Sequence, residues 1–83
     1  MRNEILEVVD KLFRRELQVP ALDPDAPLVD YGLDSVRSIS LVVEMESAFG
    51  VQISDEQATA MRTLREVVGQ VAAALSARGG EAA

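Results

Sequence analysis

The chain has 83 residues, of which 48% are hydrophobic and only 4% aromatic, so a single small domain over residues 1–83 with an aliphatic core is expected. Cysteine and histidine are both absent, which excludes disulfides, a thiolate zinc site and a Ser-His-Asp triad. The net charge of −6 argues against nucleic acid as a partner, because phosphate backbones repel an acidic surface.

The first helix is predicted from about Asn3 to Leu17, where apolar residues recur with i, i+3 and i+4 spacing. Its core-facing side should comprise Ile5, Val8, Val9, Leu12, Phe13 and Leu17. Residues 18–34 contain three prolines and one glycine, and therefore predict a long loop. We expect apolar side chains of this loop to hold it against the core, namely Val19, Leu22, Leu28, Val29 and Leu33.

The second helix is predicted to begin near Ser35 and to end near Phe49, with Gly50 as its C-terminal stop. At about 100° per residue its apolar side chains form two stripes. The stripe that should face the core consists of Leu41, Val42, Met45 and Phe49, with Ser38 beside it.

The second stripe of this helix consists of Val36, Ile39 and Val43. It either packs against the long loop or forms an exposed strip on which partner proteins dock. We expect docking for Val36 and Val43, and both interpretations stay open for Ile39.

Two capping boxes predict the remaining helices. Ser54 and Gln57 should start a short third helix of six or seven residues, and Thr63 and Glu66 should start the last one. We expect Gly79-Gly80 to end the last helix and residues 79–83 to fray. Its predicted core stripe is Leu64, Val67, Val68, Val71, Ala72 and Leu75.

Charge is concentrated in residues 20–60, which contain eight acidic residues and one basic residue, Arg37. An acidic region of this kind is expected to attract basic partners. It does not predict a metal site, because Leu28 stands where a calcium loop starting at Asp23 needs glycine.

No apolar run has the length of a membrane span and the first residues are unlike a signal peptide, so a cytoplasmic protein without membrane contact is expected.

The Asp34-Ser35 pair at the start of the second helix has three interpretations. Either residue can be an ordinary helix N-cap, which stabilises by about 1 kcal/mol. A nucleophilic serine is disfavoured, because histidine is absent and Lys11 is the only lysine. The third interpretation is a modification site, since a helix N-terminus favours a phosphate group.

Residues 28–37, Leu-Val-Asp-Tyr-Gly-Leu-Asp-Ser-Val-Arg, resemble the attachment motif of acyl and peptidyl carrier proteins, and the resemblance extends over nearly the whole chain. It implies an all-α four-helix bundle of the acyl-carrier type that is a carrier and not an enzyme. It also implies that a phosphopantetheinyl transferase, with magnesium, attaches 4′-phosphopantetheine from coenzyme A to Ser35, and that the thiol of this arm holds an acyl group as a thioester. Gly32, Leu33 and Asp34 match the motif ahead of the modified serine.

The same resemblance implies that partner enzymes dock on the second helix, at Val36, Arg37, Ile39, Ser40, Val43 and Glu46. Arg37 and Ser40 stand where fatty-acid carriers usually have acidic residues, so the motif is more similar to aryl and peptidyl carrier domains. This predicts a discrete monomeric carrier, loaded by an adenylating enzyme with an amino or aryl acid, that serves downstream condensing or tailoring enzymes of a nonribosomal-peptide-type pathway. The alternatives are a polyketide or fatty-acid acyl carrier and a helical interaction module without a prosthetic group.

Overall fold

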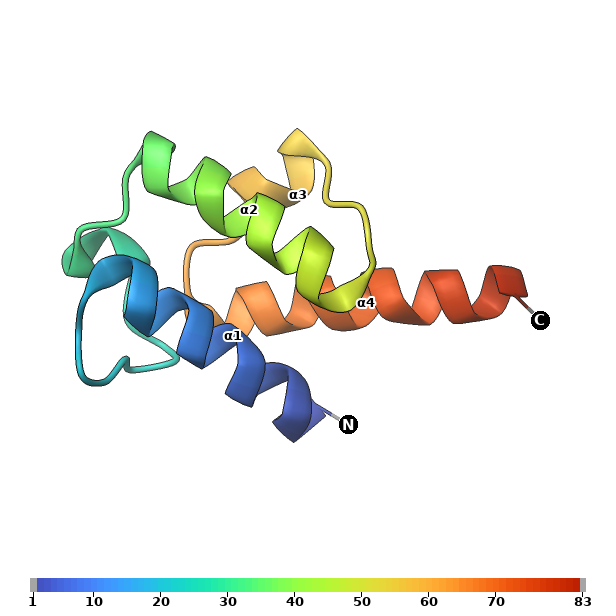
Figure 1. Cartoon of the computed structure of the whole chain (residues 1–83), viewed down its shortest axis with the longest axis horizontal. Coiled ribbons are helices and arrows are strands. Elements are labelled where there is room, and N and C mark those ends of the chain that lie inside the picture. Colours follow the sequence, from blue (N-terminus) through green and yellow to red (C-terminus); the bar gives the residue numbers. More distant parts are fainter. Residues whose placement is uncertain (1, 83) are drawn as a thin grey trace.

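The computed structural model describes residues 2–82 of the chain, and the surroundings of the side chains of residues 4–77. Figure 1 shows that α1 runs in the opposite direction to α2 and α4, and that the long segment between α1 and α2 wraps around one end of the bundle. The predicted all-α architecture, with three main helices and one short helix, is confirmed. The elements are α1 (Arg2–Leu17), the 3-10 helix η1 (Leu28–Tyr31), α2 (Ser35–Phe49), α3 (Asp55–Thr59) and α4 (Leu64–Ala82).

Both ends of α2 lie at the predicted residues. Asp34 is the N-cap, and its Oδ1 accepts the backbone N–H of Arg37 at 2.8 Å. Gly50 ends the helix with a φ of 65°, and its N–H donates to the Glu46 carbonyl at 2.9 Å. This left-handed conformation is easily adopted by glycine.

The two predicted capping boxes are confirmed. Ser54 Oγ accepts the Gln57 N–H at 3.1 Å, and Gln57 Oε1 accepts the Ser54 N–H at 2.8 Å. Thr63 and Glu66 exchange equivalent hydrogen bonds at 3.1 and 3.2 Å. The predicted length of the third helix is wrong, because α3 has only five residues. None of these five residues is buried, so α3 lacks the packing against the core that would stabilise a longer helix.

The prediction that Gly79-Gly80 ends the last helix is wrong, because α4 continues to Ala82. Glycine lowers helix stability by about 1 kcal/mol but keeps its backbone N–H, so it does not by itself interrupt the hydrogen-bond ladder. Of the predicted frayed tail, Ala83 lies outside the described residues. None of the described helices combines the length and the apolar character that crossing a bilayer requires.

The core lies where α1 packs against α2 and α4. Among the described side chains no polar or charged residue is buried, so the core is aliphatic as predicted, with Phe13 as its large aromatic piece. Val8 was predicted to face this core but is 39% exposed, since the apolar stripe of α1 is narrower than expected. The buried cluster consists of Val9, Phe13, Leu17, Leu28, Leu41, Met45, Met61, Leu64, Val67, Val68 and Val71.

Most of the predicted anchors of the long loop do contact the core. Leu28 is 1% exposed, and Val19, Leu22 and Leu33 pack partly buried against the cluster. The prediction for Val29 is wrong, because its side chain is 69% exposed. Leu28 and Val29 are neighbours in the 3-10 helix η1, where successive side chains are about 120° apart, so they cannot both point inward.

The loop is also bonded to the start of α4, in a way that the sequence did not indicate. The Leu28 N–H donates to the Arg62 carbonyl at 2.9 Å, and the Arg65 N–H donates to the Pro24 carbonyl at 3.0 Å. The Arg65 guanidinium binds both carboxylate oxygens of Asp25, at 2.6 and 3.2 Å. These bonds fix the loop, and with it η1, against the segment between α3 and α4.

Acid should remove the contribution of the Asp25–Arg65 pair to stability. Hydrogen bonds from Arg65 hold the pKa of the Asp25 carboxyl below its usual range. The contribution is therefore complete above the ordinary pKa of about 3.9 and is lost as the pH falls through the lowered folded-state value. We expect Asp25→Asn to lower the urea midpoint slightly at about pH 7, and this difference from the parent to shrink as the pH falls below the ordinary pKa of about 3.9. A difference that does not change with pH would contradict this assignment.

Candidate functional site

Ser35 is the first residue of α2 and is exposed. The structure decides which member of the Asp34-Ser35 pair caps the helix, because Asp34 accepts the Arg37 N–H. The Ser35 hydroxyl makes no hydrogen bond to any described residue. It is therefore available for chemistry, at a helix end where backbone N–H groups and the helix dipole favour negative charge.

Gly32 turns the chain between η1 and α2. It has a φ of 96° and ends η1 by donating its N–H to the Val29 carbonyl at 3.1 Å. A Cβ placed on Gly32 would meet only Arg37 Nη1, at 3.9 Å, so backbone conformation and not space favours glycine here. The neighbouring Leu33 donates its N–H to the Leu28 carbonyl at 3.3 Å. The serine is thus held by a short, bonded segment and not by a flexible loop.

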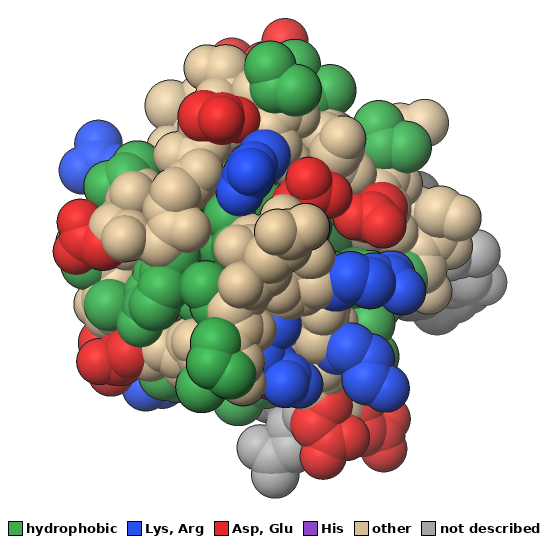
Figure 2. Space-filling model, turned by 60° about the vertical axis from the view of Figure 1, so that its left-hand side comes forward, with side chains coloured by type: hydrophobic (Ala, Val, Ile, Leu, Met, Phe, Trp, Pro, Cys, Tyr) green, Lys and Arg blue, Asp and Glu red, His purple; other side chains and the backbone are tan. Residues whose placement is uncertain are grey.

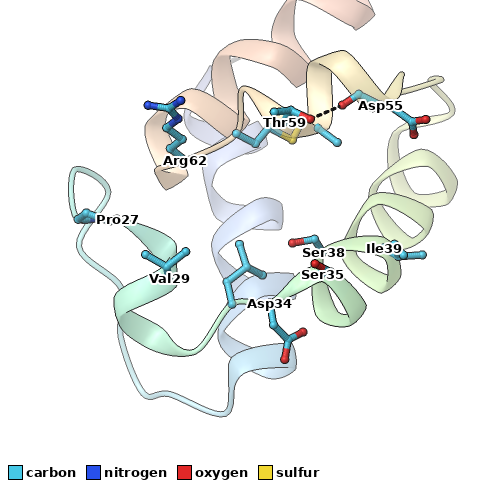
Figure 3. Close-up of a pocket in the computed structure, with 12 residues that line it drawn as sticks. Pro27, Val29, Asp34, Ser35, Ser38, Ile39, Asp55, Thr59 and Arg62 are labelled. Atoms are coloured by element: carbon cyan, nitrogen blue, oxygen red, sulfur yellow. Dashed lines mark hydrogen bonds between the residues drawn. The ribbon is translucent and has the colours of Figure 1, made fainter.

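A groove of about 660 Å³ opens beside Ser35, between the start of α2, η1 and α3 (Figure 3). The hydroxyls of Ser35 and Ser38 lie along one wall. Thr59 lies across the groove on α3, where its hydroxyl donates to the Asp55 carbonyl at 2.8 Å. An extended polar arm attached at Ser35 has room to lie in this groove, with hydroxyl groups on both walls.

A second cavity lies behind the groove, between α2 and α3. Its volume is about 20 Å³, close to the space of one water molecule. Leu33, Ser38, Ala58 and Met61 line both spaces, so the two spaces adjoin at these residues. The half-buried Ser38 hydroxyl is the polar group at this boundary.

The far wall of the groove was not predicted. It is formed by side chains of α3 and of the segment before α4, including Thr59, Met61 and Arg62, and by Pro27 and Val29. Local sequence patterns carry no signal for this wall, because it depends on contacts between segments about 30 residues apart. The hydrogen bond from Leu28 to Arg62 is what brings these segments together.

The predicted docking residues are spread over α2. Val36, Ile39 and Val43 are 75%, 67% and 58% exposed, so the interpretation in which this stripe packs against the loop is wrong. Ser40 is exposed and Arg37 is half-buried. Glu46, predicted as a docking residue, is half-buried and accepts the Ile53 N–H at 2.9 Å, which ties the link before α3 to α2.

The residues around Ser35 fit a phosphate-linked prosthetic group, since they offer an unbonded exposed hydroxyl at a helix N-terminus beside an open groove. The family model described as a phosphopantetheine attachment site matches residues 7–71 of the chain. The chain belongs to the phosphopantetheine-dependent carrier proteins. Covalently attached 4′-phosphopantetheine is accordingly the cofactor of this carrier, and the family speaks against an interaction module without a prosthetic group.

Curated relatives agree with this family. The carrier is 34% identical over 70 residues to an acyl carrier protein of Thermosynechococcus vestitus, an alignment that covers 81% of this chain and 86% of the relative. It is 36% identical over 67 residues to an acyl carrier protein of Solidesulfovibrio magneticus, covering 77% and 86%. A mycocerosic acid synthase-like polyketide synthase of Mycolicibacterium smegmatis is 38% identical over 66 residues, which are 80% of this chain and 3% of that protein. Family membership implies interaction with a phosphopantetheinyl transferase and with enzymes that handle acyl groups.

Proposed function

We propose that Ser35 is the residue that carries the 4′-phosphopantetheine arm. The observation that supports this assignment is the division of roles at the start of α2. Asp34 uses its carboxylate to cap the helix, whereas the adjacent Ser35 hydroxyl is exposed and unbonded. When bound, the arm supplies a thiol that holds acyl groups as thioesters. The protein presents this thiol and is not itself an enzyme.

The residues ahead of Ser35 have positioning roles in this proposal. Gly32 provides the left-handed turn that leads into α2, and Leu33 packs partly against the core while lining the groove. Asp34 holds the first turn of the helix in place. The first backbone N–H groups of α2 favour the negative charge of a phosphate on the neighbouring hydroxyl. The attachment point is therefore ordered before any partner binds.

We further propose that the cargo is an amino or aryl acid, loaded by an adenylating enzyme and passed to condensing or tailoring enzymes of a nonribosomal-peptide-type pathway in the cytoplasm. The support is the character of α2, in which Arg37 and Ser40 replace acidic residues typical of fatty-acid carriers. A second candidate is a polyketide or fatty-acid acyl carrier, and it is favoured by the names of the relatives. In both cases the tether raises the effective concentration of the cargo at each enzyme.

The mass of the intact protein tests the attachment residue. We expect incubation with coenzyme A, magnesium and a broad-specificity phosphopantetheinyl transferase to add one phosphopantetheine to the parent chain and to Ser38→Ala. Ser35→Ala should gain nothing while keeping its helical circular dichroism spectrum, since an exposed hydroxyl contributes little to folding. A mass gain in Ser35→Ala, or none in a folded and initially unmodified parent, would disprove the assignment.

The modified protein then distinguishes the two kinds of cargo. We expect adenylating enzymes supplied with ATP and amino or aryl acids to load it, and acyltransferases supplied with malonyl-coenzyme A to load it poorly. The reverse result would assign the chain to the polyketide or fatty-acid class.

A further inference from the structure

Two spaces near Ser35 differ in what they can hold. The groove has a volume of about 660 Å³, whereas the cavity behind it, which we call the inner cavity, has a volume of about 20 Å³. Four residues line both spaces. An acyl group on an arm attached at Ser35 can therefore lie along the groove or pass inward between these four residues. Which of the two it does depends on how firmly they close the boundary.

The inner cavity is enclosed by fully packed side chains of the core. Phe13, Leu41 and Met45 line it without reaching the groove, and they are 2%, 1% and 1% exposed. The space between them is that of about one water molecule. An aliphatic chain of several carbons would have to displace these side chains, and a well-packed core resists such an insertion.

On the α3 side, the boundary is anchored in the core. It consists there of Ala58 and Met61, and Met61 belongs to the buried cluster with a side chain that is only 9% exposed. The next residue, Arg62, accepts the Leu28 N–H at 2.9 Å, which ties this side of the boundary to η1. Opening the inner cavity toward the groove would therefore take Met61 out of the core.

On the α2 side, the boundary presents a hydroxyl group. Figure 3 shows the Ser38 side chain pointing toward the groove. Its Oγ forms no hydrogen bond within the described part of the chain, and no fully buried N or O atom of a described side chain lacks a partner, so this oxygen is open to the water of the groove. An aliphatic chain that passed inward would remove this water and leave the hydroxyl unpaired, which is unfavourable.

The groove, in contrast, suits both the polar and the apolar parts of an attached arm. Thr59 on the opposite wall donates its hydroxyl to the Asp55 carbonyl at 2.8 Å, so its oxygen can still accept an N–H group, while Ser38 can donate. Val29 is 69% exposed and adds apolar surface. Figure 2, which brings this end of the bundle forward, shows hydrophobic side chains at the surface between charged ones. Amide groups and a small acyl group thus find partners here without any change in the core.

We propose that this carrier holds its cargo in the groove and excludes aliphatic chains from the inner cavity, with Met61 as the residue that sets this limit. The inference rests on the proposed attachment at Ser35, from which both spaces are reached. It narrows the cargo to acyl groups that are short, polar or aromatic. A long saturated chain held in the open groove would keep most of its apolar surface in water, which is unfavourable.

Methyl resonances of the intact carrier test where the cargo lies. A broad-specificity transferase supplied with magnesium and acetyl-, benzoyl- or octanoyl-coenzyme A loads each acyl arm, and the mass of the protein verifies the attachment. We expect the benzoyl and octanoyl forms to differ from the acetyl form in the methyl signals of Val29 and Thr59, which line the groove and not the inner cavity. The signals of Leu41 and Met45, which line only the inner cavity, should be the same in all three forms.

Met61→Ala should convert the chain into a carrier that takes up an aliphatic cargo. Removing this side chain joins the two spaces and leaves an apolar cavity, which is the kind of site that binds apolar groups. For the parent, the urea midpoints of the acetyl and octanoyl forms should agree within about 0.2 M, whereas in Met61→Ala the octanoyl form should unfold about 1 M higher than the acetyl form. Met61→Leu nearly conserves volume and is the matched control, which should behave like the parent.

Other results would overturn the proposal. If the octanoyl group shifts the signals of Leu41 or Met45 in the parent, or raises its urea midpoint, the cargo enters the core, although attachment at Ser35 stands. If it shifts neither set of methyl signals, the cargo lies in water and not in the groove. A parent chain that gains no mass overturns the attachment as well. Should Met61→Ala fail to fold, the methyl signals of the parent still decide between the groove and the inner cavity.

Discussion

Replacement of Leu41 by alanine is expected to lower the free energy of unfolding by about 3 kcal/mol. Leu41 is 1% exposed and belongs to the cluster in which α2 packs against α1. Its removal would enlarge the small cavity between α2 and α3, which Leu41 already lines. A domain of this size is typically stable by only about 4–12 kcal/mol, so the loss should be visible as a large decrease in the urea midpoint.

Val43→Ala is the matched control for Leu41→Ala. It shortens an aliphatic side chain two positions further along the same helix, but Val43 is 58% exposed, so stability should change by less than about 0.5 kcal/mol. Leu41→Met should lie between the two, since it nearly conserves volume. If Leu41→Ala and Val43→Ala had equal effects, α2 would not face the core as described.

Local sequence signals were sufficient for both ends of α2, for the starts of α3 and α4 and for the position of Ser35. Asp34, Gly50 and the Ser54 capping box are features of single helix ends. Their hydrogen bonds join residues only three or four positions apart, so the local sequence is enough to predict them. The core stripe of α2 follows from helical periodicity, and Leu41 and Met45 are indeed buried. The exposed stripe was also visible, although only the structure shows that the loop does not cover it.

Features that depend on contacts between distant segments could not be predicted in the same way. The groove wall opposite Ser35 exists because the loop is bonded to residues 62–65, through pairs such as Leu28 with Arg62 and Asp25 with Arg65. The outward position of Val29 depends on η1. This element is too short to show a periodic pattern of apolar residues, so the sequence did not predict it. The role of Glu46 follows from the path of the chain after Gly50, which brings the Ile53 N–H to its carboxylate.

The same substitution should have opposite effects at two glycines of this chain. Gly32→Ala is expected to lower the free energy of unfolding by about 1–2 kcal/mol, because its φ of 96° disfavours residues with a Cβ. Gly69→Ala is expected to raise it by about 0.5–1 kcal/mol, because Gly69 lies inside α4 and a Cβ there meets nothing within 4 Å. Urea denaturation of both variants measures these changes.

The two variants should also differ in the modification of Ser35. Gly32 orients the short segment that leads into α2, so a change in its conformation displaces the hydroxyl that the transferase must reach. We expect Gly32→Ala to lower kcat/KM for phosphopantetheine transfer about tenfold or more. Gly69→Ala should leave it unchanged. If Gly32→Ala lost stability but kept the transfer rate of the parent, the turn would serve folding alone, and the orientation of Ser35 would have to come from the Asp34 cap and the packing of Leu33.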